Sequence, residues 1–262
     1  MSLSPDQVAA ASAATTWVPD NATSEETDEY RVVRLPDYFD PPLRLLRFSP
    51  AGPLEPALEA ALDRARQFGL PDLQWTLAVN SPPELAGLLE ARGATVTETV
   101  DVLALDLANG APALPPPDPD LDLTVNWATD LQTITDSTEL AAEIFGGSVP
   151  PQARLIEIAE RDSAAIPGGR GGMVVAYADE TPLGTGGVAI TTGVARLWGG
   201  AVRPAARGRG VYRATLAARL DYCAAHGATM ALVNARVETS APILRQAGFA
   251  PYGQELRYRV PL

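Results

Sequence analysis

The sequence contains no lysine, because all 20 of its basic residues are arginine. This excludes three kinds of site that depend on a lysine side chain: a Schiff base, a pyridoxal-phosphate centre and a Walker-type phosphate loop. The single cysteine, Cys223, excludes an internal disulfide framework and fits a reducing compartment, so we expect a cytoplasmic protein. The chain also has only one histidine, and one cysteine and one histidine are too few for a typical zinc site, so we expect no metal site.

Basic charge and long apolar runs are also scarce. The net charge of -12 argues against a nucleic-acid partner, because binding a phosphate backbone needs a basic face, and we expect no such partner. No segment approaches the roughly 18 uninterrupted apolar residues of a membrane span, and we expect no membrane association. The N-terminus lacks the positive flank of a secretion signal. Apolar residues make up 46% and charged residues 20%, which is typical of a soluble globular protein.

A proline-rich segment divides the chain. The stretch GAPALPPPDPDLD runs from Gly110 to Asp122, and its prolines remove backbone donors and disfavour helix. We therefore predict a first domain over residues 1–110, a linker over 111–121 and a second domain over 122–262.

The two halves end with the same order of elements: helix, glycine, strand, a helix that starts near proline, glycine and a final strand. The glycines are Gly69 and Gly93 in the first half and Gly227 and Gly248 in the second, 24 and 21 residues apart. Such self-similarity indicates a diverged internal repeat with an α/β fold and a mixed sheet.

In the second half, hydrophobic periodicity predicts alternating strands and helices. The strands are expected at 122–127, 172–178, 183–190 and 194–202, and the helices at 131–144, 151–161 and 209–225. The pair Gly199-Gly200 interrupts the apolar strand 194–202. Glycines at such a place indicate a β-bulge or a close backbone approach.

The turn ARGRGVYR, residues 206–213, connects that strand to the next helix. A helix N-terminus offers free backbone N–H groups and a partial positive charge, and glycines let an anion approach them. The arginines add charged, fork-shaped donors, so the turn is a candidate pyrophosphate site. A solvated, arginine-rich helix start is the alternative interpretation.

Four segments of the second half resemble the GCN5-related N-acetyltransferase (GNAT) superfamily: VARLWGGAVRP, ARGRGVYRATL, TMALVNARV and SAPILRQAGF. The family signature is Arg/Gln-x-x-Gly-x-Gly/Ala. Here Arg207 and Gly210 match it, and Tyr212 replaces its last small residue. The first half ends in a segment that resembles the end of a GNAT unit, but no such turn precedes it. The resemblance implies a tandem GNAT protein with a degenerate N-terminal unit.

The resemblance also implies acetyl-CoA as cosubstrate, with the pantetheine arm along the strand 194–202 and the pyrophosphate on the turn. The cofactor-binding residues it implies are Gly200, Ala201, Val202, Arg207, Gly208, Arg209, Gly210, Val211, Tyr212, Arg213 and Ser240. The expected reaction is direct transfer of acetyl to a primary amine of a small molecule or peptide, in a ternary complex. Two alternatives stay open: an acyl-CoA-binding module without catalysis, and a mycothiol-synthase-like acyltransferase.

The catalytic residues are less clearly marked. The family's usual acid, a tyrosine four residues before the closing glycine, is replaced by Leu244, which leaves Tyr212, Tyr252 or water. We expect Glu238, at the end of the strand that contains TMALVNARV, to be the general base.

Other polar and reactive side chains have structural interpretations. Asp136, Glu139 and Glu143 share a helix face and either attract a cationic amine or are simply solvated. We expect Cys223 to be a core residue and His226 to cap its helix.

Overall fold

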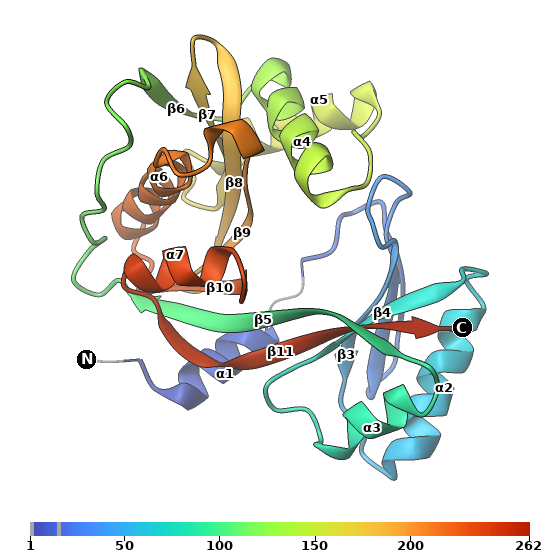
Figure 1. The fold of residues 1–262 in the computed structure, drawn as a ribbon. Helices are drawn as coiled ribbons and strands as arrows, with labels where there is room; N and C mark the ends of the chain where they lie inside the picture. The colour runs from blue at the N-terminus through green and yellow to red at the C-terminus, as the bar shows by residue number, and fades with distance from the viewer. Residues whose placement is uncertain (1–2, 15–16) are drawn as a thin grey trace.

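The computed structural model describes residues 3–14 and 17–262 and contains an 11-stranded sheet in the order β1-β2-β3-β4-β11-β5-β10-β9-β8-β7-β6 (Figure 1). The elements of the first half are α1 (Pro5–Ala14), β1 (Thr23–Glu26), β2 (Tyr30–Arg34), β3 (Leu43–Phe48), α2 (Leu54–Arg66), β4 (Asp72–Leu77), α3 (Glu84–Glu90) and β5 (Thr95–Asp106). Those of the second half are β6 (Leu123–Trp127), α4 (Leu131–Phe145), α5 (Gln152–Ala165), β7 (Gly171–Ala178), β8 (Thr181–Thr191), β9 (Val194–Val202), α6 (Val211–Ala225), β10 (Met230–Arg236), α7 (Ser240–Gln246) and β11 (Ala250–Pro261). No helix in the described residues is long and apolar enough to cross a membrane.

The predicted repeat is confirmed. In the first half β3, α2, β4, α3 and β5 follow one another, and in the second half β9, α6, β10, α7 and β11 do the same. In both halves the strand before the helix pairs in parallel with the strand after it. The two halves therefore contain the same strand–helix–strand unit, despite their different sequences.

The last strand of each half crosses to the other half. Strand β5 pairs with β10 from Met230↔Asp106 to Arg236↔Val100, while β11 pairs with β4 from Leu256↔Leu77 to Pro261↔Asp72. At the centre β5 and β11 pair with each other, and Figure 1 shows them running side by side. The two sequence halves thus share one continuous sheet.

Because of this exchange, the hydrophobic core of each half contains side chains from the last strand of the other half. Leu103 of β5 is buried with Leu216 and Leu220 of α6, whereas Tyr258 of β11 is buried with Trp75 of β4. Each of these five side chains is at most 1% exposed. Burying a large apolar side chain contributes about 1.5–3 kcal/mol, so the exchanged strands stabilise both halves.

The predicted elements of the second half are found within a few residues of their expected bounds. Asp130 caps α4: its carboxylate accepts from the Thr133 N–H at 2.8 Å, and the Thr133 hydroxyl accepts from the Asp130 N–H at 3.3 Å. Strand β8 begins at Thr181, two residues before the expected strand 183–190, because Asp179 and Glu180 both adopt positive φ angles and close the turn after β7.

Helices cover both faces of the second half. The Thr185 hydroxyl of β8 lies 2.6 Å from the Ser137 hydroxyl of α4, while a Cβ on the next residue, Gly186, would meet Arg219 of α6. Since successive residues of a strand point to opposite faces, α4 and α6 lie on opposite sides of β8 (Figure 1).

Candidate functional site

Strands β9 and β10 separate partway along their length. Their parallel pairing comprises only Met230↔Val194, Ala231↔Ala195 and Leu232↔Arg196. Beyond Arg196, no register pair joins β9 to β10 in the described part of the chain. One backbone edge of β9 is therefore left without a neighbouring strand.

The predicted bulge lies in this region of β9. The register to β8 shifts between Thr185↔Ala201 and Gly187↔Trp198, which leaves one extra residue on β9. Gly199 there has a φ of 59°, in the left-handed region that glycine tolerates. A bulge bends its strand and increases its twist, so it accounts for the divergence of β9 from β10.

The turn after β9 presents unpaired backbone donors. A 3-10 turn at Pro204–Ala206 leads to Gly208 and Gly210, with φ angles of 78° and 83°, and α6 begins at Val211. In residues 3–14 and 17–262, the N–H groups of Gly208, Arg209 and Gly210 donate to no protein acceptor. Free N–H groups at the start of a 15-residue helix are suited to receive an anion, and we refer to these three groups as the cradle.

The linker packs directly on this turn. The Asp118 N–H donates to the Arg209 carbonyl at 3.0 Å, and Arg209 Nε lies 2.8 Å from Asp118 Oδ2. The hydrogen bond from Arg209 holds the pKa of Asp118 below its usual value. A Cβ on Gly210 would lie only 2.6 Å from the Pro117 Cα. The linker, which was expected only to separate two domains, thus covers one side of the cradle.

The other arginines near the turn also have internal partners. Arg213 donates to the carbonyls of Pro115 and Pro116, each at 3.4 Å. Arg207 is exposed and donates to the Val202 carbonyl at 3.3 Å. Arg203 Nε lies 3.2 Å from Glu143 Oε2 of α4. The basic groups are therefore already oriented by the protein itself.

Tyr212 connects the turn to the bulge. Its ring packs against Gly200, where a Cβ would lie 2.8 Å from the ring and 3.3 Å from the phenol oxygen. Burial raises the pKa of this phenol, while the charge of Arg219 opposes the rise. The structure thus brings two of the predicted site residues, Tyr212 and Gly200, into contact.

The remaining predicted cofactor residues surround this contact. Ala201 and Val202 continue β9 beyond the bulge with buried side chains, Val211 is buried at the first position of α6, and Ser240 is half-buried at the start of α7.

Glu238 requires a correction. Strand β10 ends at Arg236, and residues 237–239 form a turn closed by the Thr239 N–H and the Arg236 carbonyl at 3.2 Å. Glu238 is exposed in that turn and makes no hydrogen bond or ion pair in the described residues. The strand ends two residues early because the chain must turn into α7. Glu238 still lies directly after β10, one of the two strands that separate, and its carboxylate has no partner among the described residues.

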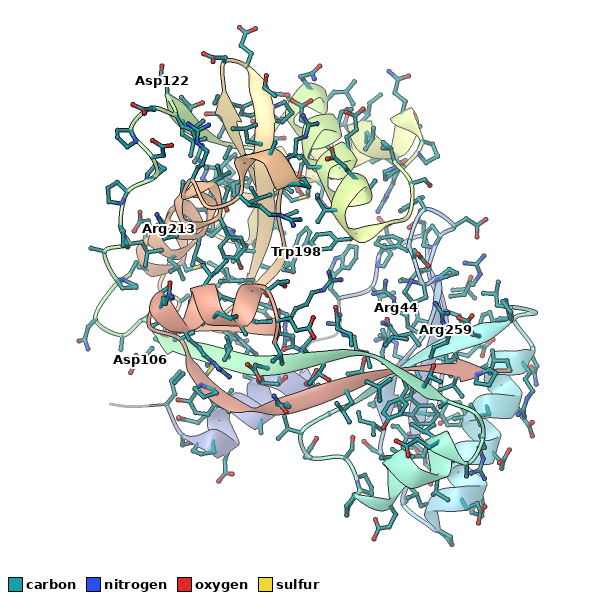
Figure 2. All side chains as sticks on the ribbon, viewed as in Figure 1. Arg44, Asp106, Asp122, Trp198, Arg213 and Arg259 are labelled. Carbon is teal, nitrogen blue, oxygen red and sulfur yellow. The ribbon has the colours of Figure 1, made fainter. Side chains whose placement is uncertain are left out.

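The carboxylates of α4 are mostly engaged. Asp136 accepts from the Tyr177 hydroxyl at 2.7 Å and from Gln132 at 2.9 Å, and Glu143 pairs with Arg203. Glu139 is exposed. Trp198, on the α4 side of β9, is 46% exposed and lies near the junction of the two halves (Figure 2).

Four other candidate side chains have structural roles. Leu244 is fully buried, and burial raises the pKa of the Cys223 thiol to about 12, which makes it a poor nucleophile. His226 ends α6 with Nδ1 2.9 Å from the Tyr222 carbonyl. Tyr252 packs beside α1 and donates to the Leu3 carbonyl at 3.3 Å.

Arg219 was not identified as a site residue from the sequence. It lies on the sheet-facing side of α6, is 1% exposed, and neighbours Tyr212. A signal was present: Arg219 follows Leu216 by three residues and precedes Cys223 by four, so it falls on the predicted apolar face of the helix. A charged residue on the apolar face of a helix predicts that a polar group is buried there.

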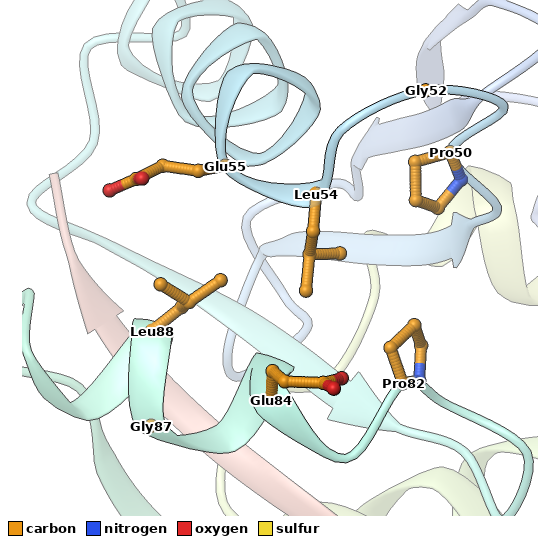
Figure 3. Close-up of a pocket in the computed structure, with 8 residues that line it drawn as sticks. All are labelled: Pro50, Gly52, Leu54, Glu55, Pro82, Glu84, Gly87 and Leu88. Atoms are coloured by element: carbon orange, nitrogen blue, oxygen red, sulfur yellow. The ribbon is translucent and has the colours of Figure 1, made fainter.

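A cavity of about 610 Å³ lies at the corresponding position of the first half, between the start of α2 and helix α3 (Figure 3). Its lining residues are Pro50, Gly52, Leu54, Glu55, Pro82, Glu84, Gly87 and Leu88. The charged groups in this lining are carboxylates, which repel phosphates. This place is therefore unlike the arginine-rich turn of the second half.

Comparisons with known proteins show what the chain is similar to. A family model described as Acetyltransferase (GNAT) family matches residues 137–249. No curated protein matches the chain.

Among solved structures, a GCN5-related N-acetyltransferase from Kribbella flavida is similar with a TM-score of 0.66 and 18% identity, over 92% of this chain and 90% of that one. One from Sphaerobacter thermophilus is similar with a TM-score of 0.65 and 18% identity, over 90% and 82%. A tandem GNAT protein from the clavulanic acid biosynthesis pathway is similar with a TM-score of 0.61 and 18% identity, over 98% and 87%. Such similarity shows that the chain has the fold of these proteins over most of its length, and residues 137–249 match the GNAT family model.

Proposed function

We propose that the second unit binds acetyl-CoA and transfers its acetyl group directly to a primary amine of a small molecule or peptide. The observation that carries this proposal is the divergence of β9 from β10 at the Gly199-Gly200 bulge, next to the unpaired amides of the turn. An unpaired strand edge and an anion cradle together match a ligand that has both amide groups and a pyrophosphate.

Each part of the site has a separate task. The backbone of Gly200, Ala201 and Val202 would pair with the amide groups of the pantetheine arm. The cradle, helped by Arg207, would hold the pyrophosphate. Acetyl-CoA supplies the activated acetyl group as a thioester, and a backbone N–H at the bulge would polarise its carbonyl.

Glu238 is proposed as the general base. An alkylammonium acceptor must lose a proton before its lone pair can attack the thioester. An exposed, unpaired carboxylate on the turn after β10 can receive that proton through a water molecule.

The proposal assigns the cofactor site to residues 122–262 alone, with 111–121 as the linker and 1–110 as the degenerate unit. The acidic lining of the first-unit cavity supports this division. We also propose a cytoplasmic location, because Cys223 is a free thiol.

Calorimetric titration with CoA, followed by acetyl-CoA turnover with a panel of primary amines, tests this proposal. We expect one CoA site per chain and release of free CoA with at least one amine. Two CoA sites per chain would contradict the degenerate first unit.

The buried Leu244, at the position of the family's usual tyrosine, favours a second candidate: an acyl-CoA-binding module that does not catalyse. CoA binding without turnover on any amine would support that module and contradict the transferase.

A further inference from the structure

Arg219 is a buried cation without a counter-ion. Its Nε donates to the Thr215 carbonyl at 2.9 Å and its Nη1 to the Gly187 carbonyl at 3.2 Å. Its Nη2 has no hydrogen-bond partner among the described residues, and the guanidinium makes no ion pair there with a carboxylate. An uncompensated buried charge is costly, so its position requires a compensating role.

The fold leaves room for this guanidinium. A Cβ on Gly186 of β8 would lie 2.6 Å from the guanidinium carbon, so any other residue there would displace it. The titratable groups facing Arg219 in the described chain are Tyr212 and Cys223, both on α6. The side chains that β6, β7 and β9 direct toward the start of α6 are apolar: Val125, Ala176 and Val202.

Tyr212 extends from this guanidinium to the strand bulge. Its ring lies on Gly200, with the phenol oxygen beside the backbone where β9 has left β10. Bulge, phenol and guanidinium therefore follow one another on the α6 side of the sheet. The atoms nearest to a Cβ on Gly200 would be those of the Tyr212 ring and hydroxyl, and Arg219 follows Tyr212 by seven residues, two turns along the same face of α6.

We propose that Tyr212 is the proton donor of the transfer reaction and that Arg219 is its positioning residue, which orients the phenol and stabilises the phenolate. This inference rests on the proposed acetyl transfer. It explains why a cation is buried without an anion: the anion is formed only during the reaction.

The chemical step is balanced. The neutral amine attacks the thioester carbonyl, a C–N bond forms, and the C–S bond breaks with its electron pair on sulfur. The Tyr212 O–H protonates that thiolate, which leaves CoA as a thiol and Tyr212 as a phenolate beside Arg219. The proton lost by the amine nitrogen returns to the phenolate through water, so the products are an amide and a thiol.

The environment of Tyr212 agrees with this role. Burial is the largest influence and raises the pKa of the phenol, and the Arg219 charge counteracts it. Without Arg219 the phenol would be a weaker acid and a poorer donor to a thiolate. Cys223 cannot replace it, because burial raises the pKa of that thiol to about 12.

The first test measures the pairing without any turnover. The protein is produced with 3,5-difluorotyrosine, whose more acidic phenol titrates at moderate pH, and ¹⁹F NMR follows each tyrosine. Tyr212→Phe identifies the Tyr212 signal. We expect Arg219→Met to raise its titration midpoint by roughly one unit or more, and Arg219→Lys to raise it much less. An unchanged midpoint in Arg219→Met would overturn the proposal.

The second test measures kcat with saturating acetyl-CoA and an accepted amine. We expect Tyr212→Phe to lower kcat by roughly 10²–10³-fold, and Arg219→Met to lower it at least about tenfold, with partial recovery in Arg219→Lys. In the Tyr212→Phe background, Arg219→Met should cause no further loss, because both residues act through one proton. If the losses of kcat from the two substitutions multiply in the double variant, Arg219 does not act through Tyr212, and its positioning role is overturned. If the wild-type protein turns over no amine, the proposed function itself is overturned.

Discussion

Gly208 and Gly210 form a matched pair that tests how the linker meets the cofactor turn. Both have positive φ angles, 78° and 83°. A Cβ on Gly208 would meet nothing within 4 Å, whereas a Cβ on Gly210 would lie 2.6 Å from the Pro117 Cα and 3.0 Å from Arg213 Nη2. Substituting alanine at each position therefore separates backbone strain from steric conflict with the linker.

The expected magnitudes differ accordingly. A left-handed conformation costs a residue with a Cβ about 1–2 kcal/mol, so Gly208→Ala should lower the free energy of unfolding by about that amount. Gly210→Ala should lose the same amount plus about 1–3 kcal/mol for overpacking against backbone that cannot rotate away. The added methyl group also lies next to the cradle amides, so CoA affinity should fall more in Gly210→Ala than in Gly208→Ala.

Urea denaturation of both variants gives the two free energies, and calorimetric titration gives the two CoA affinities. The Gly208→Ala protein serves as the control for strain alone. Equal losses of stability in the two variants would refute the packing of Pro117 on the turn. A CoA affinity that is unchanged in Gly210→Ala would show that the turn is only a helix start.

Three further predictions concern other parts of the second half. Arg207→Ala should weaken CoA binding by about 1.5–3 kcal/mol, the usual value of a charge-assisted hydrogen bond, and an unchanged dissociation constant would exclude Arg207 from the phosphate site. Glu238→Gln should lower turnover by roughly 10²–10⁴-fold with unchanged CoA affinity, and a variant that keeps most of its turnover would shift the assignment to Glu139 or Glu143. Asp130→Ala should destabilise the protein by about 1 kcal/mol in thermal unfolding through loss of the α4 capping box, with CoA affinity as the unaffected control.

The local features of the site were predictable because they are encoded in neighbouring residues. Gly199-Gly200 inside an apolar run predicted the bulge, since few other residues adopt the φ of 59° found at Gly199. The glycines and arginines of residues 206–213 predicted a turn that leads into a helix, and α6 begins at Val211. The order of helices and strands also revealed the repeat.

The pairing of β5 and β11 could not be read in the same way. Alternation in a strand indicates which side chains face a core, but any strand with the same alternation can supply the neighbouring edge. The two strands lie at equivalent ends of their halves, and β5 is buried over five successive residues, Val100 to Ala104, so its sequence does not even mark one core-facing side. Only packing in three dimensions decides that Leu103 joins the second core and Tyr258 the first.

By itself, the sequence determined the elements, the repeat, the bulge and the amide-lined turn, because each depends on residues close together along the chain. The tertiary structure alone decided three other features: the strand exchange, the contact of Asp118 with Arg209, and the burial of Arg219 beside Tyr212 without a carboxylate. The first two join segments about 90 residues or more apart, and the third depends on a glycine of β8 that leaves space for the guanidinium. Contacts between distant segments depend on how the whole chain fills its volume, and a local pattern cannot specify them.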